Sequence, residues 1–365
     1  MVVFAHATIS IPRTERKNMN ILAIDLGKFN SMACFYNSET KEHRFQLCKT
    51  ERNYLTTLLK SEDFDLIVME ACSCSGWVSD ICNDLGLATL VCSTHEEAWR
   101  WRNVKRKTDR DDALKLARLA AGGELKPTYV PSSEMREYRG LIKYRKNLVN
   151  RINRLKNSTR ALFVRRGITI DRGEKAWFTG RELINSYRKP LAECSMNELW
   201  QGELDQLLTQ LDTVTELLLA TERKLSAIAR SDERVKRLQQ IDGVGRVTAE
   251  AIVCAIDDAS RFKNARQVSA YAGLVPRQYQ SGETDRRGRI TKRGCRLLRT
   301  LLVECAWISL RYNEWSKVTY ARIHGGKKVR RKKAAVALAR KILVVAWAML
   351  RDQSDYDKER LLSGI

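Results

Sequence analysis

The chain lacks the residue patterns that build small metal-bound or disulfide-bonded domains. It has four His, and its ten Cys are scattered without any C-x-x-C pair, Cys72 and Cys74 being the closest. Four His cannot complete a zinc-finger pattern beside such cysteines. Scattered thiols are typical of proteins in a reducing cytosol, so we expect the cysteines to be free.

Long hydrophobic runs are also missing. No stretch of about 18 apolar residues occurs, so no segment is predicted to span a bilayer. The start, MVVFAHATISIPRTERKNMN, has a weak apolar patch without a basic region ahead of it, which is not the pattern of a signal peptide. Residues 1–18 are predicted to be an N-terminal arm, either disordered or extended, and the protein is expected in the cytoplasm.

Acidic residues are too few to balance the basic ones. Lys and Arg number 66 against 43 Asp and Glu, which gives the 365-residue chain a net charge of +23. So many like charges repel one another and disfavour a compact chain. An oppositely charged partner is the simplest reason for a protein to keep them, and nucleic acid is the leading candidate. A membrane surface is the rival, but no amphipathic basic helix stands alone. The 44% of apolar residues suffices for a core, and the length suits two or three domains.

Residues 19–130 show an α/β pattern. Apolar or alternating strands are predicted at NILAIDLG, SMACFYN, EHRFQLC, DLIVME and LATLVCS, with a short helix at RNYLTTLLKS and another over 109–121.

Residues 131–234 are predicted to be helical, with apolar residues at coiled-coil spacing. One seam runs from Leu141 to Leu162, and a cleaner one alternates steps of three and four from Leu204 to Ile228. Either an antiparallel hairpin within the chain or pairing between chains would satisfy this pattern. Residues 163–196 form the linker between the two seams.

Residues 235–365 are predicted to be mostly helical. VKRLQQIDGVGRVTAEAIVCAIDD resembles a helix-hairpin-helix, in which Gly243 and Gly245 would offer backbone N–H groups to a phosphate. An ordinary turn between helices is the alternative. Two further stretches are strongly basic. Seven Lys or Arg and no acid lie between Arg286 and Arg299, and HGGKKVRRKK at 324–333 is either a solvated loop or a nucleic-acid contact.

Four acids could form one site. Asp25 and Glu70 each end an apolar strand, where sites in α/β folds form. Asp109 and Asp112 are three residues apart, so a helix would place them on one face, with Asp111 turned to solvent. Four carboxylates suit Mg²⁺ or Mn²⁺, and two such ions polarise a phosphodiester.

A structural role for these aspartates is the alternative. Thr108 could cap the helix with Asp111 at its third position, in a variant of the capping box. Either Asp109 or Asp112 would also suit the positive end of the helix dipole.

Both sets of motifs resemble one family. AIDLG, VMEACSCSGW and KTDRDDALKLARL look like the Asp-Glu-Asp-Asp motifs of a RuvC-like domain with the RNase H fold. IDGVGRVTAEAI and SAYAGLVPRQYQSGETDRRGRITKRGCRLLRTLLVECA look like the C-terminal domain of the same proteins. Together they resemble the insertion-sequence 110 family of transposases, including the 1111 group, over residues 20–350.

The resemblance implies a recombinase that excises and inserts a mobile element in bacteria, associating with the nucleoid when it acts. It implies Mg²⁺ bound by Asp25, Glu70, Asp109 and Asp112, and a covalent 5′-phosphoserine link formed by Ser281. It also implies donor and target double-stranded DNA, a structured bridge RNA encoded by the element, and a dimer or tetramer that shares composite sites. Glu283-Thr284 departs from the Gly-Lys-like continuation of many relatives.

The basic segments then become candidates for holding DNA or RNA. Trp99 and Trp101 could stack on unpaired bases or simply pack in the core. Predicted nucleic-acid contacts are Lys105, Arg106, Lys107, Gly243, Gly245, Arg277, Arg286, Arg287, Arg289, Lys292, Arg293, Lys327, Lys328, Arg330 and Arg331.

Three alternatives stay open. Tyr279, two residues from Ser281, could attack in its place, whereas Ser269 falls in a segment predicted as helix. The protein could be a RuvC-type junction-resolving nuclease in which water attacks and no adduct forms. It could also be a scaffold that binds nucleic acid without cleaving it.

Overall fold

The structure is a computed structural model that describes residues 18–93, 108–281 and 284–363. The chain divides into two units, Met1–Arg136 and Glu137–Ile365. The predicted domains 19–130, 131–234 and 235–365 stay predictions, as does the arm at 1–18. Trp99, Trp101 and the predicted contacts Lys105, Arg106 and Lys107 lie outside the described residues. No helix among the described residues is long and apolar enough to cross a membrane.

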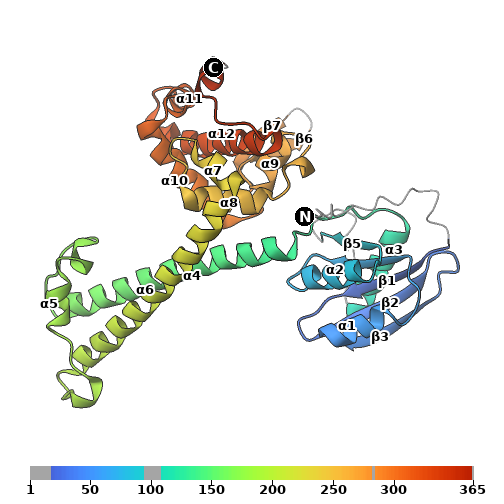
Figure 1. The fold of residues 1–365 in the computed structure, drawn as a ribbon, viewed down its shortest axis with the longest axis horizontal. Helices are drawn as coiled ribbons and strands as arrows, with labels where there is room; N and C mark the ends of the chain where they lie inside the picture. The colour runs from blue at the N-terminus through green and yellow to red at the C-terminus, as the bar shows by residue number, and fades with distance from the viewer. Residues whose placement is uncertain (1–17, 94–107, 282–283, 364–365) are drawn as a thin grey trace. The chain divides into compact units, whose positions relative to one another are not determined.

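The first unit contains a five-stranded mixed sheet in the order β3-β2-β1-β4-β5 (Figure 1). β1 pairs antiparallel with β2 and parallel with β4, and β5 extends the parallel side. The predicted strands are confirmed within a residue or two of their ends. The strands are β1 (Asn20–Asp25), β2 (Asn30–Asn37), β3 (His43–Lys49), β4 (Leu66–Glu70) and β5 (Thr89–Cys92).

Helices cover both faces of this sheet, which is why β1 and β4 are almost continuously apolar. One hydrophobic cluster joins Ala23 and Val68 to Leu116 and Ala117 of α3 (Asp109–Ala121). The opposite cluster joins Ile24 to residues of α1 (Arg52–Leu59) and α2 (Ser75–Asp84). The sheet lies between the two clusters, and successive residues along a strand belong alternately to one cluster and to the other.

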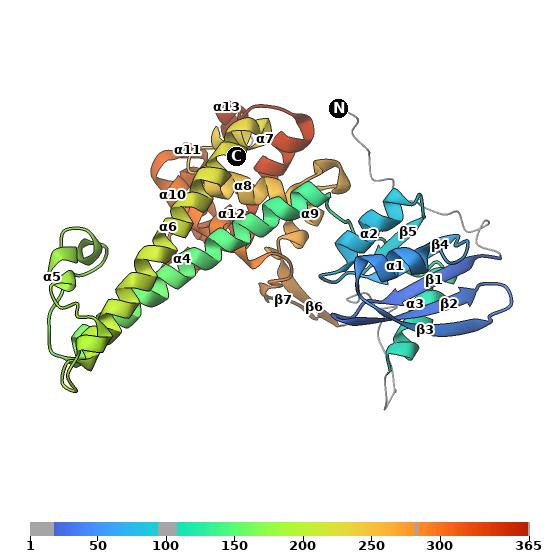
Figure 2. The same ribbon diagram turned by 60° about the horizontal axis from the view of Figure 1, so that its bottom comes forward.

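Two 33-residue helices, α4 (Ser133–Arg165) and α6 (Leu199–Ser231), lie side by side (Figures 1 and 2). Arg165 pairs with Glu203 at 3.7 Å, and Arg145 pairs with Glu222 at 2.5 Å further along, so the helices run antiparallel. Apolar residues of both predicted seams pack in one cluster. Contacts within one chain therefore account for much of this apolar spacing.

The residues between α4 and α6, predicted as a linker, contain three short helices. Their apolar side chains contact the same cluster, which includes Ala176 and Ile184. The elements are η3 (Lys175–Trp177), α5 (Arg181–Asn185) and η4 (Leu191–Glu193).

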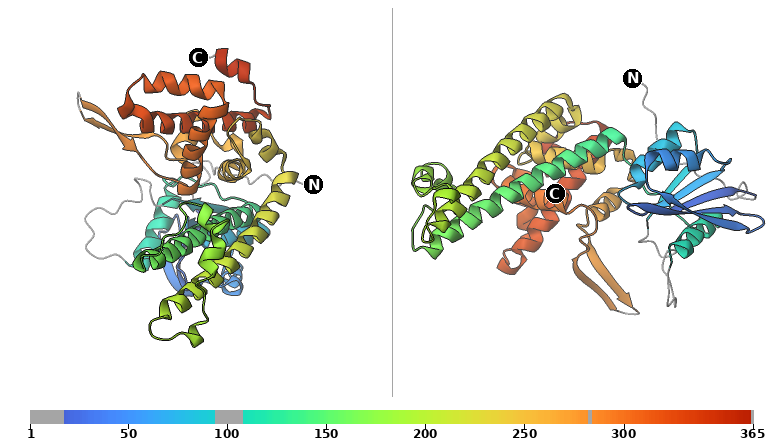
Figure 3. Two further views of the ribbon diagram at one scale, coloured as in Figure 1. Left: turned by 90° about the vertical axis from the view of Figure 1, so that its left-hand side faces the viewer. Right: turned by 90° about the horizontal axis from the view of Figure 1, so that it is seen from below.

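The remaining helices pack around α12, whose Leu338, Ile342 and Ala346 lie in the largest hydrophobic cluster. A two-stranded hairpin, β6 (Pro276–Ser281) and β7 (Thr284–Ile290), projects from them (Figure 3). The helices are α7 (Glu233–Gln239), α8 (Arg246–Ile256), η5 (Ala259–Arg261), α9 (Ala265–Tyr271), α10 (Arg296–Tyr312), α11 (Glu314–His324), η6 (Lys328–Arg330), α12 (Arg331–Asp352) and α13 (Lys358–Ser363).

All ten cysteines are free thiols, as the sequence predicts. Several are buried in apolar surroundings, and burial raises the pKa of Cys305 and of Cys254 to about 12. Such thiols stay protonated near neutral pH and behave as small apolar residues.

Candidate active site and nucleic-acid interface

Two of the four candidate carboxylates end neighbouring strands. Asp25 is the last residue of β1 and Glu70 the last of β4, and both side chains are half-buried. The two strands pair in parallel, so both residues lie at the same end of the sheet. Side chains alternate between faces, and Asp25 shares the face of Ala23 while Glu70 shares that of Val68. Both carboxylates therefore belong to the face that α3 covers.

The other two candidates lie in the first turn of α3. Thr108 caps this helix: its hydroxyl accepts from the Asp111 backbone N–H at 3.3 Å, and the Asp111 carboxylate accepts from the Thr108 backbone N–H at 3.0 Å. The capping-box prediction is thus confirmed. Hydrogen bonds from the Thr108 hydroxyl and backbone hold the pKa of Asp111 below its usual value. Asp111 is exposed as expected, whereas Asp112 is half-buried.

In the described structure, the side chains of these four acids do not form a complete set of metal ligands. Across the described part of the chain, no three His, Cys, Asp or Glu side chains lie close enough together to hold a metal ion. The donor chemistry is nonetheless that of a hard divalent cation, because all four groups are carboxylates. Asp25 and Glu70 are the pair that the sheet brings to one edge and one face.

Ser281 lies in the second unit, at the end of the hairpin. It is the final residue of β6 and pairs with Thr284, the first residue of β7. Tyr279, the alternative nucleophile, is 58% exposed on the same strand and lies opposite Arg286. Ser269 is buried on α9 and donates to the Ala265 carbonyl at 2.7 Å, so its hydroxyl already has a structural role.

The root of the hairpin is fixed to the helices by one guanidinium. Arg299 Nη1 donates to the carbonyls of Ala272, Arg293 and Gly294 at 3.1, 2.7 and 3.1 Å. Gly273 and Gly294 both have positive φ, and a Cβ on either would overlap the backbone on the other side of the root. The two chain segments that carry the strands are therefore tightly joined where they leave the helices.

Exposed cations line the hairpin and the loop between α11 and α12. Lys292 adopts a left-handed backbone, φ 56°, just past the end of β7. Of the predicted contacts, those with exposed side chains are Arg277, Arg286, Arg289, Lys292, Arg293, Lys327, Lys328, Arg330 and Arg331. The side chain of Arg287, like that of Ser281, lies outside the described side chains.

The two glycines of the predicted helix-hairpin-helix differ in their surroundings. Gly243 has φ 99° and lies against Ser309 of α10, and its carbonyl accepts a hydrogen bond from Cys305 Sγ. Gly245 is the N-cap of α8 and has open space where a Cβ would be. Gly243 thus has a packing role, and Gly245 has the exposed position that a phosphate contact requires.

The arrangement is that of a nucleic-acid-processing protein: an α/β domain with carboxylates at one sheet edge, and a helical domain with a cationic hairpin. Comparison with known proteins gives the family. The IS116/IS110/IS902 transposase family model matches residues 235–321, and a DEDD transposase model of the IS110 group matches residues 22–165. Together these matches span more than half of the chain.

Full-length relatives agree with both matches. The chain is 29% identical to the transposase for insertion sequence element IS1111A of Coxiella burnetii, over 97% of each protein. It is 28% identical to a probable family 20 transposase of Pseudomonas aeruginosa, over 93% of this chain and 99% of that one. It is also 27% identical to a pilin gene-inverting protein of Moraxella bovis, over 70% and 69%.

The chain therefore belongs to the IS116/IS110/IS902 family of transposases, enzymes that recombine DNA. Its first unit is an RNase H-like DEDD domain, a class that typically uses divalent metal ions.

Sequence reasoning missed two features of the site. The β6–β7 hairpin has a signal in the sequence Ser-Gly-Glu-Thr, because Gly followed by a polar residue is a pattern typical of short hairpin turns. Arg299 has no such signal, because its three acceptors come together only when α10 packs beside the hairpin root.

Proposed function

We propose that this transposase is guided by a bridge RNA and cleaves DNA with Ser281 as the nucleophile, forming a 5′-phosphoserine intermediate. The observation that carries the proposal is the position of Ser281 at the end of a cationic hairpin whose root is rigidly anchored. A residue that must reach a DNA phosphate needs a projecting position and a fixed base.

The step exchanges one phosphate ester for another. The Ser281 hydroxyl oxygen attacks phosphorus and loses its proton, a bond from serine oxygen to phosphorus forms, and the bond to the 3′ oxygen breaks. That oxygen takes up a proton and leaves as a 3′ hydroxyl. Attack by another 3′ hydroxyl on the phosphoserine reverses the step and reseals the strand without ATP, because the number of ester bonds is conserved.

Arginines beside the serine would hold the reacting phosphate. Arg277 lies on the same strand, while Arg286 and Arg287 lie on the partner strand. Guanidinium groups bind phosphate through paired hydrogen bonds, and they stabilise the extra negative charge that develops in the transition state.

The carboxylates would hold Mg²⁺ or Mn²⁺, with Asp25 and Glu70 as strand-borne ligands and Asp109 and Asp112 as helix-borne ones. The ion would supply charge stabilisation at the scissile phosphate. The acids lie in the first unit and Ser281 in the second, so a dimer or tetramer with composite sites is part of the proposal.

Guidance by RNA fits the excess of positive charge. Base pairing between the RNA and donor or target DNA would read sequence, while the protein holds backbones. The net charge of +23 and the exposed cations of the hairpin suit that role.

Trapping the adduct tests the proposal. Purified protein with its co-purifying RNA and labelled target DNA is run on a denaturing gel. Ser281→Ala is expected to abolish the protein–DNA adduct, whereas Tyr279→Phe, changed two residues away, keeps it. Asp25→Asn and Glu70→Gln are expected to abolish cleavage and adduct together.

Two outcomes would overturn the mechanism. An adduct that survives Ser281→Ala would exclude this nucleophile, and hydrolysed ends without any adduct would indicate a nuclease that uses water. Full biological activity after all four acids are changed would indicate a scaffold. RNA sequencing of the purified complex tests guidance separately, because only RNA from the element's own flanks supports it.

A further inference from the structure

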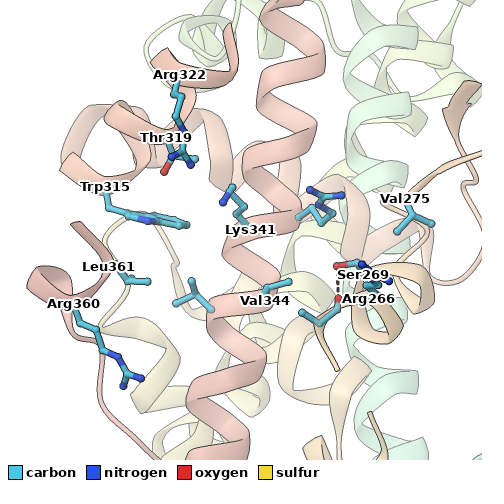
Figure 4. A pocket seen from close by; sticks show the side chains of 13 residues that line it. Arg266, Ser269, Val275, Trp315, Thr319, Arg322, Lys341, Val344, Arg360 and Leu361 are labelled. Atoms are coloured by element: carbon cyan, nitrogen blue, oxygen red, sulfur yellow. Dashed lines mark hydrogen bonds between the residues drawn. The ribbon is translucent and has the colours of Figure 1, made fainter. Parts of the chain in front are cut away.

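A cavity of about 500 Å³ lies within the second unit, between helices far apart in the sequence (Figure 4). Its walls come from α9, the start of the hairpin, α11, α12 and α13. Figure 4 shows Trp315, Thr319 and Arg322 of α11 on one side of α12 and Arg266 and Ser269 of α9 on the other. Cavities of this volume accept ligands the size of a nucleotide.

The cavity is lined by cations and by no carboxylate. Its basic residues come from four helices: Arg266, Arg322, Arg340, Lys341 and Arg360. Lys341 is half-buried, and burial, with Arg322 and Arg340 nearby, lowers its pKa. A cation held among other cations costs folding free energy, because each disfavours the charge on the next. An anionic ligand would offset that cost.

A buried hydroxyl in the wall lacks a partner. Thr319 is 0% exposed, and its Oγ1 has no hydrogen-bond partner in the described structure. Unpartnered buried polar groups are rare and costly, so each calls for an explanation. Rotation of the side chain toward the cavity would let a phosphate or sugar oxygen there accept the hydrogen bond that Thr319 can donate.

The rest of the wall is apolar and leads to the hairpin. Val344 and Val345 of α12, Leu361 of α13 and the almost fully buried Trp315 supply that surface. Val275, also in the wall, directly precedes β6, and its carbonyl accepts from the Thr291 N–H at the hairpin root. The cavity therefore opens beside the base of the strand that ends at Ser281.

We propose that this cavity binds one unpaired nucleotide of a nucleic-acid strand. Its phosphate lies on Lys341 and Arg340, and its base lies on the apolar wall. An unpaired nucleotide fits better than duplex DNA, because the walls enclose a volume that a double helix cannot enter. The inference goes beyond the proposed function: it requires a strand to be bound but no strand to be cut.

Equilibrium binding tests it with the full-length chain and short labelled single-stranded RNA and DNA at several salt concentrations. Lys341→Met keeps the side-chain volume and removes the charge. Thr319→Val keeps the shape and removes the hydroxyl. Lys236→Met is the control, because Lys236 is exposed on α7, away from the cavity, and already pairs with Glu233 at 2.6 Å.

Lys341→Met is expected to weaken oligonucleotide binding by about tenfold, the equivalent of one charge-assisted contact. The slope of log affinity against log salt is expected to fall by about 0.7, the value for one phosphate contact to a single strand. Thr319→Val is expected to weaken binding without changing that slope. Both variants should unfold at the wild-type temperature or above, since each loses a group that burial disfavours.

Loss of binding without loss of stability separates a ligand site from a structural role. Equal weakening in Lys341→Met and Lys236→Met would overturn the proposal.

A second arm measures the unfolding temperature with 5′-AMP or inorganic phosphate. One outcome is that these raise the melting temperature of the wild type but not of Lys341→Met, while Lys341→Met binds oligonucleotides as the wild type does. In that case the ligand is a free nucleotide and the assignment to a strand is wrong. Ser281→Ala should bind as the wild type does, so failure here is distinguishable from failure of the cleavage mechanism.

Discussion

Gly243 and Gly245, two residues apart, should respond very differently to the same substitution. An added Cβ at Gly243 would lie 2.8 Å from Cα and Cβ of Ser309 and 3.0 Å from its backbone N, and the backbone φ is already 99°. Gly245 has an ordinary negative φ of −81° and nothing within 4 Å of the same atom. Alanine at each position therefore tests the geometry of this turn.

The magnitudes follow from those surroundings. A non-glycine residue at such a φ costs about 1–3 kcal/mol of backbone strain. Overlap with the α10 backbone, which has no flexible end to move aside, adds about 1–3 kcal/mol more. Gly245→Ala costs only about 0.5–1 kcal/mol, because alanine is a poorer N-cap than glycine. Gly243→Ala is thus expected to destabilise the second unit by about 2–6 kcal/mol.

Thermal unfolding followed by circular dichroism measures the difference. In a unit of this size, each kcal/mol shifts the melting temperature by about 2–4 °C, so Gly243→Ala should melt roughly 4–24 °C lower and Gly245→Ala within about 4 °C of wild type. Equal shifts, or a larger shift for Gly245→Ala, would refute the packing of Gly243 against α10.

Two further predictions concern charged groups of the second unit. Arg299→Met removes three hydrogen bonds at the hairpin root, so amide hydrogen exchange there should speed up, with about 2–3 kcal/mol lost locally. Arg289→Met, an exposed change on β7, should leave exchange at the root as in the wild type. Glu222→Gln leaves Arg145 without its carboxylate and leaves Arg246 paired with Glu250 alone, and should cost roughly 2 kcal/mol in denaturant unfolding at neutral pH, between the values for surface and buried pairs.

The effect of Glu222→Gln should also depend on pH. Burial opposes the charge on Glu222, but hydrogen bonds and charges of Arg145 and Arg246 hold its pKa below the ordinary 4.5. The stabilisation is therefore present above pH 4.5 and lost as pH falls below it, so wild type and variant should converge in acid. Glu250, whose pKa burial raises, contributes with the opposite sign, and less so in the variant, because the Glu222 charge adds to that rise. A difference that stays constant into acid would contradict the pairing.

Local features could be predicted from the sequence, because their partners are close along the chain. Thr108 and Asp111 form a capping box three residues apart, and strands ending at Asp25 and Glu70 follow from apolar runs that stop at a charge. The apolar spacing of the two long helices likewise requires only a helical period. The family motifs added what spacing alone does not carry, namely Ser281 as the expected nucleophile.

Features that depend on atoms from distant segments of the chain were decided only by the tertiary structure. Arg299 gains its role from three carbonyls at the hairpin root, and only α10 distinguishes Gly243 from Gly245. The cationic cavity draws on residues from Ala265 to Leu361, with no period or motif to mark them. Apolar periodicity and helix caps depend on interactions between residues that are close together along the chain. Steric overlaps, the hydrogen bonds of Arg299 and the cavity depend on distances between atoms that only the packing of the helices creates.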